Sequence, residues 1–186
     1  DTSVDSHKAL PLIDFSKERL ELVELYPYKK TFDEGLVSVM VAHLNIPSLE
    51  PQTNIPSSAS YNIVTNLLQK ELGFNGLIFT DGLAMKGATD FKGPGDLEIA
   101  VLLAGNDIFL GPDNVPEAFQ KLEEAYAQGV ITEERLAHSV KKILHYKFKA
   151  GLNKYKPIDM NNINGDLNPI QNDALHYKLY ENAITV

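Results

Sequence analysis

The feature that most constrains the fold is an alternation of short apolar runs with helix-forming segments. The apolar runs cover residues 37–42, 77–80 and 107–110 and consist mainly of β-branched and other large apolar residues. Strands that alternate with helices pair in parallel, because each helix returns the chain to the same end of the sheet. The sequence therefore predicts an α/β fold with about three parallel strands.

The segments between the runs carry helix-start and helix-stop signals. Ser16 and Thr132 stand where a side chain can cap a helix, and Gly35 and Gly73 stand where a helix can end. The predicted helices cover residues 16–25, 27–35, 60–72, 97–104, 116–127, 132–149 and 174–181.

The remaining segments read as loops. Residues 43–57, 90–95 and 151–169 are rich in Pro, Gly, Asn and Asp, which interrupt regular structure. In the helix predicted at 132–149, the residues expected to face inward are Leu136, Val140, Ile143 and Leu144.

A carboxylate stands at the end of the second apolar run. Thr80 and Asp81 follow the run directly, and Gly82 then allows the backbone to turn. The carboxyl end of a buried strand is where α/β enzymes place catalytic acids. The alternative is that Asp81 only caps the helix that follows.

The segment around this carboxylate resembles a known signature. Gly73-Phe-x-Gly-Leu-Ile-Phe-Thr-Asp81-x-Leu-x-Met85-x-Gly87-Ala88 is similar to the nucleophile motif of family 3 glycoside hydrolases. Within that family it is closest to the β-N-acetylglucosaminidase branch.

Other segments resemble the same branch and occur in the family's order. Residues 1–11, with Asp5-Ser-His7, resemble the loop that carries the general acid/base. Residues 39–43 resemble a strand between that loop and the nucleophile, and residues 180–186 resemble the exit from the catalytic domain. The resemblance therefore runs through nearly the whole chain.

The resemblance implies that Asp81 is the nucleophile, His7 the general acid/base and Asp5 its orienting partner. The chemistry agrees, since a retaining glycosidase needs a nucleophile and a separate proton donor beside the leaving oxygen. Histidine ordinarily titrates near neutrality, and a neighbouring carboxylate can accept its ring N–H. The alternative for Asp5-Ser-His7 is a solvated loop.

Two further residues are candidates for substrate binding. His43 ends a predicted strand at the same edge as Asp81, so it could contact substrate, bond a water in the site wall or be satisfied within the core. Met85 could line the sugar pocket, although packing is the alternative. We expect no metal and no cofactor, because no His, Asp or Glu set has ligand spacing.

The resemblance also predicts how much of a domain is present. We expect residues 1–150 to be the carboxyl-terminal part of a TIM-type (β/α)8 barrel, incomplete in this chain, and residues 151–186 to lead out of it. A complete barrel usually takes about 250 residues, against 186 here. The alternative is an autonomous three-stranded unit. One departure from the family is Gly82, where many relatives carry a second Asp.

Composition excludes several partners. The net charge of −8 argues against nucleic acid, whose binding proteins present basic patches. No apolar run approaches the roughly 20 residues that span a bilayer. The expected partners are an N-acetylglucosamine-containing glycan and the missing amino-terminal part of the barrel. Cytoplasmic and exported bacterial locations both remain open.

The leading interpretation is an exo-glycosidase that removes terminal β-linked N-acetylglucosamine, with peptidoglycan fragments as a plausible source. A β-glucosidase-like enzyme, a phosphorolytic exo-glycosidase and a non-catalytic carbohydrate-binding module are the alternatives. These 186 residues alone are expected to be inactive.

Overall fold

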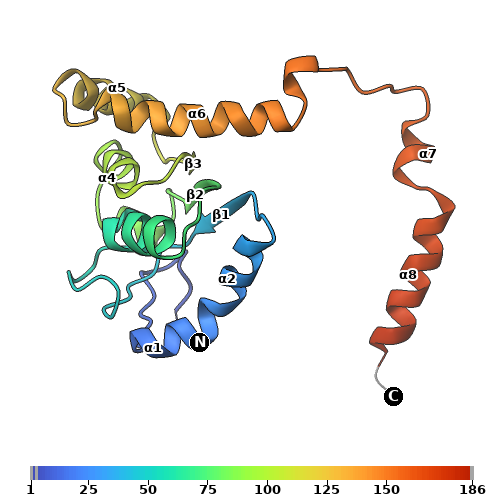
Figure 1. The fold of residues 1–186 in the computed structure, drawn as a ribbon, viewed down its shortest axis with the longest axis horizontal. Coiled ribbons are helices and arrows are strands. Elements are labelled where there is room, and N and C mark those ends of the chain that lie inside the picture. Colours follow the sequence, from blue (N-terminus) through green and yellow to red (C-terminus); the bar gives the residue numbers. More distant parts are fainter. Residues whose placement is uncertain (1, 3, 185–186) are drawn as a thin grey trace. The chain divides into compact units, whose positions relative to one another are not determined.

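The computed structural model describes residues 2 and 4–184 (Figure 1). Residues 1 and 3 of the amino-terminal motif and residues 185 and 186 of the exit segment lie outside the described residues. The chain divides into two compact units, Asp1–Lys147 and Phe148–Val186.

The first unit contains a parallel sheet of three strands, β1 (Ser38–Val41), β2 (Leu77–Gly82) and β3 (Ile108–Leu110), in the order β1-β2-β3. This confirms the predicted α/β class and the positions of all three strands. β2 runs two residues further than predicted and includes Asp81 and Gly82. The three carboxyl ends therefore share one edge of the sheet.

Helices connect and cover the strands (Figure 1). Ser16 Oγ accepts the N–H of Arg19, and Thr132 Oγ1 accepts that of Arg135, so both predicted caps are confirmed. The helices of this unit are α1 (Lys17–Arg19), η1 (Leu20–Glu24), α2 (Tyr26–Asp33), η2 (Ser57–Ala59), η3 (Asn62–Glu71), α3 (Lys86–Thr89), α4 (Asp96–Ala104), α5 (Val115–Ala127) and α6 (Glu133–Lys149).

The core lies around β2 and the helix that follows it. Ile78 of β2 packs with Val64 of η3 and Ala104 of α4, and all three are buried. Leu83, directly after β2, packs with Val101 of α4 in a second buried cluster. Buried packing of Ile78 against η3 and α4, and of Leu83 directly after the strand, therefore fixes the strand that carries Asp81.

The predicted inward face of α6 is confirmed in part. Leu136, Val140 and half-buried Ile143 line one cavity with Phe109 of β3, whereas Leu144 is 59% exposed. Polar residues of α6 also contact the residue before β3, because Asp107 is buried. Its carboxylate accepts bonds from Ser139 Oγ at 2.6 Å and from the ammonium of Lys142.

Arg135 completes this polar junction. Its guanidinium donates to the carbonyl oxygens of Asn106 at 2.6 Å and Leu102 at 2.9 Å, and to Ser139 Oγ at 2.8 Å. Burial lowers the pKa of Arg135, and the nearby Asp107 carboxylate opposes that shift. Buried charges persist only where they are paired and hydrogen-bonded. The contacts of Arg135 and Asp107 therefore fix which polar residues of α6 face the rest of this unit.

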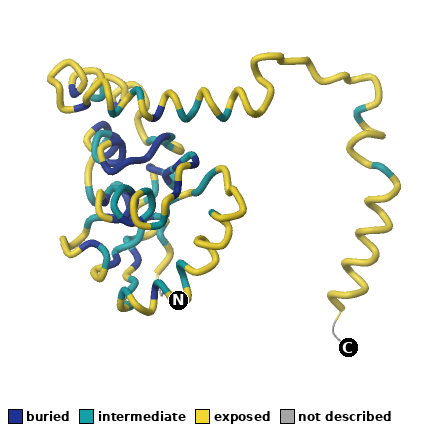
Figure 2. The backbone as a smooth tube through the Cα atoms, viewed as in Figure 1, coloured by how far each residue is buried: buried dark blue, intermediate teal, exposed yellow. Residues whose placement is uncertain are grey.

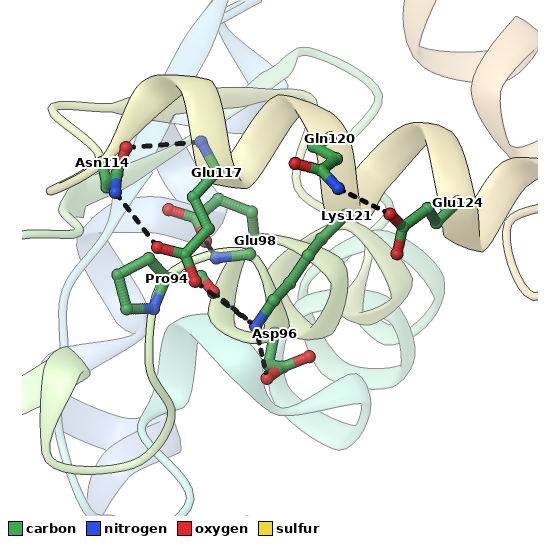
Figure 3. Close-up of polar contacts among 9 residues, drawn as sticks. Pro94, Asp96, Glu98, Asn114, Glu117, Gln120, Lys121 and Glu124 are labelled. Carbon is green, nitrogen blue, oxygen red and sulfur yellow. Dashed lines mark hydrogen bonds and ion pairs between the residues drawn. The ribbon is translucent and has the colours of Figure 1, made fainter.

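Figure 3 shows a second polar junction, between α4 and α5. Lys121 of α5 reaches Asp96 Oδ2 and the carbonyl of Pro94, each at 3.0 Å, across the start of α4. Its pKa is raised by the hydrogen bond to Asp96. Glu98 accepts the N–H of Gly95 at 2.6 Å. The turn before α4 is therefore bonded to α5 through Pro94 and to α4 through Gly95.

The second unit consists of η4 (Leu152–Lys154), α7 (Ile163–Leu167) and α8 (Ile170–Ala183). None of its described residues is buried (Figure 2). The prediction of a continuous loop at 151–169 is wrong, because η4 and α7 interrupt it. Asn162, directly before α7, donates to Asp166 across one turn, and this local contact supports a helix among residues typical of loops.

Candidate active site

Asp81 is the last residue but one of β2, and its side chain is half-buried. Its Oδ1 accepts the N–H of Gly82 at 2.7 Å. The residue before α3 is Met85, which makes no side-chain cap. The alternative that Asp81 caps the next helix is therefore wrong, and its carboxylate lies at the edge where the strands end.

His43 lies beneath this carboxylate and has no exposed surface. Its Nε2 lies 3.0 Å from the carbonyl oxygen of Gly82, and its Nδ1 lies 2.7 Å from Ser58 Oγ. A carbonyl only accepts, so Nε2 carries the proton and Nδ1 accepts from the serine hydroxyl. Burial lowers the pKa of His43, while its bond to Gly82 and the charge of Asp81 oppose that shift.

Both ring nitrogens of His43 are thus occupied by protein groups, as expected for a histidine satisfied within the core. Ser58 in turn accepts a bond from Asn106 Nδ2 at its carbonyl oxygen, at 2.7 Å. His43, Ser58 and Asn106 thus form a buried chain of hydrogen bonds that connects the Gly82 carbonyl to the residues just before β3. Ser58 and Asn106 were not singled out from the sequence, since a lone Ser or Asn carries no signal of such contacts.

His7 and Asp5 form the pair that the sequence predicted. His7 Nδ1 lies 2.8 Å from Asp5 Oδ1, and the backbone N–H of His7 donates to the same oxygen at 3.0 Å. Because a carboxylate only accepts, Nδ1 carries a proton and Nε2 is the nitrogen available to a substrate. The pKa of Asp5 is lowered, first by the backbone bond from His7 and then by its ring.

The loop that carries this pair is folded on itself. The N–H groups of Lys8 and Ala9 donate to the carbonyl of Asp5 at 2.9 and 3.2 Å. The carbonyl of Ser6, between the two paired residues, accepts the N–H of Gly87 in α3 at 3.1 Å. The proposed acid/base loop is therefore in direct contact with the segment that follows Asp81.

Met85 is half-buried in the turn between β2 and α3. A Cβ placed on Gly82 would lie 3.3 Å from its sulfur, so the Met85 side chain lies against Gly82. Met85 and Gly82 are also joined by a backbone bond of 3.0 Å. The thioether thus occupies space beside the candidate nucleophile, which is compatible with a sugar contact and with packing.

The remaining histidines lie on helices, as the sequence predicted. His138 and His145 lie on α6, and His176 lies on α8 of the second unit. Among residues 2 and 4–184, no group of three or more His, Asp or Glu is arranged to hold a metal ion. In the same part of the chain, no helix combines the length and apolarity needed to cross a membrane.

Comparison with known proteins identifies the family. The family described as glycosyl hydrolase family 3 N terminal domain matches residues 1–146. β-Hexosaminidase A of Pseudoalteromonas piscicida is 31% identical over 170 residues, which are 80% of this chain and 28% of that protein.

Solved structures agree in fold. A family 3 β-N-acetylglucosaminidase from Paenibacillus sp. matches with a TM-score of 0.81 at 33% identity, over 87% of this chain and 31% of that chain. A β-glucoside phosphorylase matches with a TM-score of 0.77 at 27% identity, over 82% of this chain and 29% of that one.

The chain spans about a third of the length of these relatives. Its three-stranded parallel sheet corresponds to part of a TIM-type barrel, as predicted. The family match, the curated relative and the solved structure of a family 3 β-N-acetylglucosaminidase agree with the family that the sequence resembles. The chain therefore belongs to glycoside hydrolase family 3, in its β-N-acetylglucosaminidase branch.

Proposed function

We propose that the full-length protein that carries this chain is a retaining exo-glycosidase that releases terminal β-linked N-acetylglucosamine. The observation that carries the proposal is the His7–Asp5 pair, whose loop is bonded through Ser6 to the segment directly after Asp81. A proton donor and a nucleophile on contacting segments are what a double displacement at a glycosidic carbon requires.

In the first proposed step, a carboxylate oxygen of Asp81 attacks the anomeric carbon. The bond to the leaving oxygen breaks, and that oxygen takes the proton from Nε2 of protonated His7. In the second step, neutral His7 removes a proton from water, the water oxygen attacks the same carbon, and the bond to Asp81 breaks. Two inversions retain the anomeric configuration.

Asp5 has a supporting role in this scheme. Its carboxylate accepts the Nδ1 proton, which orients the ring and stabilises the imidazolium that precedes each protonation of the leaving group. A histidine base is neutral when it receives the proton from water, so it adds no second anion beside Asp81 during deglycosylation.

The substrate contacts are proposed from position. Met85 lies beside Gly82 and is a candidate for lining the sugar pocket. Both ring nitrogens of His43 are already bonded to protein groups. His43 would therefore affect the site indirectly, by holding the Gly82 carbonyl in place. Peptidoglycan fragments are the proposed natural substrates, because they carry β-linked N-acetylglucosamine.

We also propose that strands outside these residues complete the catalytic barrel. In the part of the chain that the structure describes, β1 and β3 each pair on one side only. Unpaired edges bind further strands readily. Residues 1–150 would then be the carboxyl-terminal part of the barrel, and residues 151–186 a segment leading out of it. These 186 residues alone would be inactive and prone to associate, which sedimentation and a glycosidase assay would test.

The proposed function is tested on the full-length protein with nitrophenyl N-acetyl-β-glucosaminide and the matching β-glucoside. The expected result is preferential release from the N-acetylglucosaminide, with the β-anomer of the free sugar appearing first by NMR. Release of the α-anomer first would contradict the double displacement. Binding of the sugar without any turnover would favour a non-catalytic module instead.

Phosphorolysis is the second candidate, favoured by the similarity to a β-glucoside phosphorylase. A histidine acid/base repels an approaching phosphate less than a carboxylate would. The same assay separates the two reactions when phosphate is added. A sugar phosphate as the main product would establish phosphorolysis, and free sugar at an unchanged rate would establish hydrolysis.

A further inference from the structure

Gly87 is a buried glycine of α3 at the point where three segments meet. Its N–H donates to the carbonyl of Ser6 at 3.1 Å. A Cβ added to it would lie 3.1 Å from that same oxygen, 3.3 Å from the carbonyl oxygen of Ala9 and 3.4 Å from Cβ of His43. The two closest of these atoms belong to the loop that carries Asp5 and His7.

The backbone at Gly87 does not itself require a glycine. Its φ lies outside the left-handed region, unlike that of Gly95 at +82°. Within a helical turn, alanine is favoured over glycine. The close approach of the loop is therefore what a side chain at this position would disturb.

We propose that Gly87 is a positioning residue that sets the location of His7 relative to Asp81. The inference rests on the proposed function and adds to it the device that brings the two catalytic groups together. The N–H of Gly87 binds the loop, and the absence of a side chain lets the loop approach the turn that begins at Asp81.

The position of Gly87 is itself tied to the nucleophile. The turn between them is closed by the N–H of Met85, which donates to the carbonyl of Gly82 at 3.0 Å. The same carbonyl accepts the ring N–H of buried His43. The Gly82 carbonyl thus holds both the backbone after Asp81 and the start of α3. The Gly87 N–H that binds the Ser6 carbonyl therefore keeps its position relative to Asp81.

A methyl group at Gly87 would displace the loop and leave the strand in place. His43 is fully buried with both nitrogens bonded, whereas Asp5 and His7 are exposed. A contact of 3.1 Å obliges the Ser6 carbonyl to retreat by a few tenths of an ångström. Proton transfer needs hydrogen-bond distance to the leaving oxygen, and a misplacement of about 1 Å can lower a rate about a hundredfold.

The test uses Gly87→Ala and Gly87→Val in the full-length protein, with Gly93→Ala as the matched control. Gly93 lies in the following turn, is exposed, and has no atom within 4 Å of an added Cβ. Aryl N-acetyl-β-glucosaminides of graded leaving-group acidity are the substrates. Dinitrophenolate needs little protonation, whereas an alkoxide or sugar leaving group needs much more.

For Gly87→Ala we expect kcat/KM to fall about tenfold for the poorest leaving group and to change little for dinitrophenolate. Gly87→Val should extend the same pattern, and Gly93→Ala should match the wild type throughout. The folding midpoint of Gly87→Ala should stay within a few degrees of the wild type.

Equal losses on all leaving groups, or wild-type kinetics for Gly87→Ala, would overturn the inference. His7→Ala in the same series separates a failure of the proposed function from a failure of the role proposed for Gly87. If His7→Ala shows no dependence on the leaving group, the proposed function fails. If His7→Ala shows that dependence and Gly87→Ala does not, only the docking role fails.

Discussion

The two proposed catalytic groups are held in opposite ways. Asp81 is the last residue but one of a strand anchored by buried Ile78, and the carbonyl of Gly82 accepts a bond from His43, which has no exposed surface. The side chains of Asp5 and His7 are 52% and 73% exposed and are held by each other and by their own turn. The proposed nucleophile is positioned by the core, and the proposed acid/base is positioned by a loop.

Substitutions near Asp81 and substitutions near His7 should therefore have different effects. A group embedded in a buried network moves only when the network opens, whereas an exposed loop can shift while the core stays folded. Substitutions near Asp81 should therefore alter chemistry and stability together, except at the carboxylate itself. Substitutions in the loop should alter the protonation step alone.

The largest effect is expected for Asp81→Asn in the full-length protein. Loss of the nucleophile removes the covalent route, so turnover should fall by at least about 10⁴-fold, which is more than 5 kcal/mol of barrier. The folding midpoint should hardly change, because the amide keeps the shape of the side chain. Chromogenic assay and thermal unfolding measure the two quantities.

Asp90→Asn is the control for that substitution. Asp90 follows α3, is exposed, and its carboxylate forms an ion pair with Lys86 at 3.2 Å. Its activity should equal that of the wild type. A comparable loss in both variants would mean that charge in this segment matters, and that Asp81 has no special role.

His7→Ala should give the next largest effect. General acid catalysis typically contributes about 10²- to 10⁴-fold, so release of a sugar leaving group should slow by that amount. Release of dinitrophenolate should slow far less in the first step. Stability should be unchanged because the side chain is exposed. His138→Ala on α6 is a matched control, and any leaving-group dependence there would undermine the assignment.

Asp5→Asn should produce a milder form of the same pattern, about tenfold on poor leaving groups. The asparagine can still accept the Nδ1 proton but does not stabilise the imidazolium by charge. Proton transfer to a poor leaving group should therefore slow, whereas release of dinitrophenolate should hardly change. Rates equal to those of the wild type on every leaving group would show that Asp5 does not assist His7.

His43→Gln should give the smallest effect, seen in the pH dependence of stability. Because the pKa of His43 is lowered in the folded protein, the unfolded chain binds a proton more readily as pH falls. The free energy of unfolding should then decrease below about pH 6.5, by at most about 1.4 kcal/mol per pH unit. Gln can still donate to Gly82 but does not titrate, so this component of the slope should disappear.

Denaturant unfolding between pH 7.5 and 5 measures that slope in both proteins. His145→Gln on α6 is the control for removing a histidine outside the site. An unchanged slope in His43→Gln would contradict the burial of a neutral ring beneath the nucleophile.

The sequence predicted the elements whose signals are local. Ser16 and Thr132 cap helices as expected, and all three strands occur where apolar β-branched runs predicted them. The pairing of Asp5 with His7 was also predictable, because the residues are two apart and the pair closes within one turn.

Contacts between distant segments were not predictable in this way. α3 contains Gly87, a poor helix former, and it forms because its residues are buried against the loop and His43. On α6, Asp107 bonds Ser139 and Lys142 beside the apolar residues that the pattern singled out, so the helix packs through charged contacts that the apolar pattern does not include. The packing of α3 and α6 depends on contacts with residues far away in the sequence, which a local sequence pattern does not reveal.

The most direct test of the central claim is to trap the covalent intermediate on Asp81. The full-length protein is incubated with an N-acetylglucosaminyl fluoride carrying a ring fluorine that slows deglycosylation, and is then digested for mass spectrometry. We expect one sugar residue on the peptide that contains Asp81, and none in Asp81→Asn. An adduct on a different carboxylate, or steady retaining turnover with no adduct on Asp81, would contradict the account.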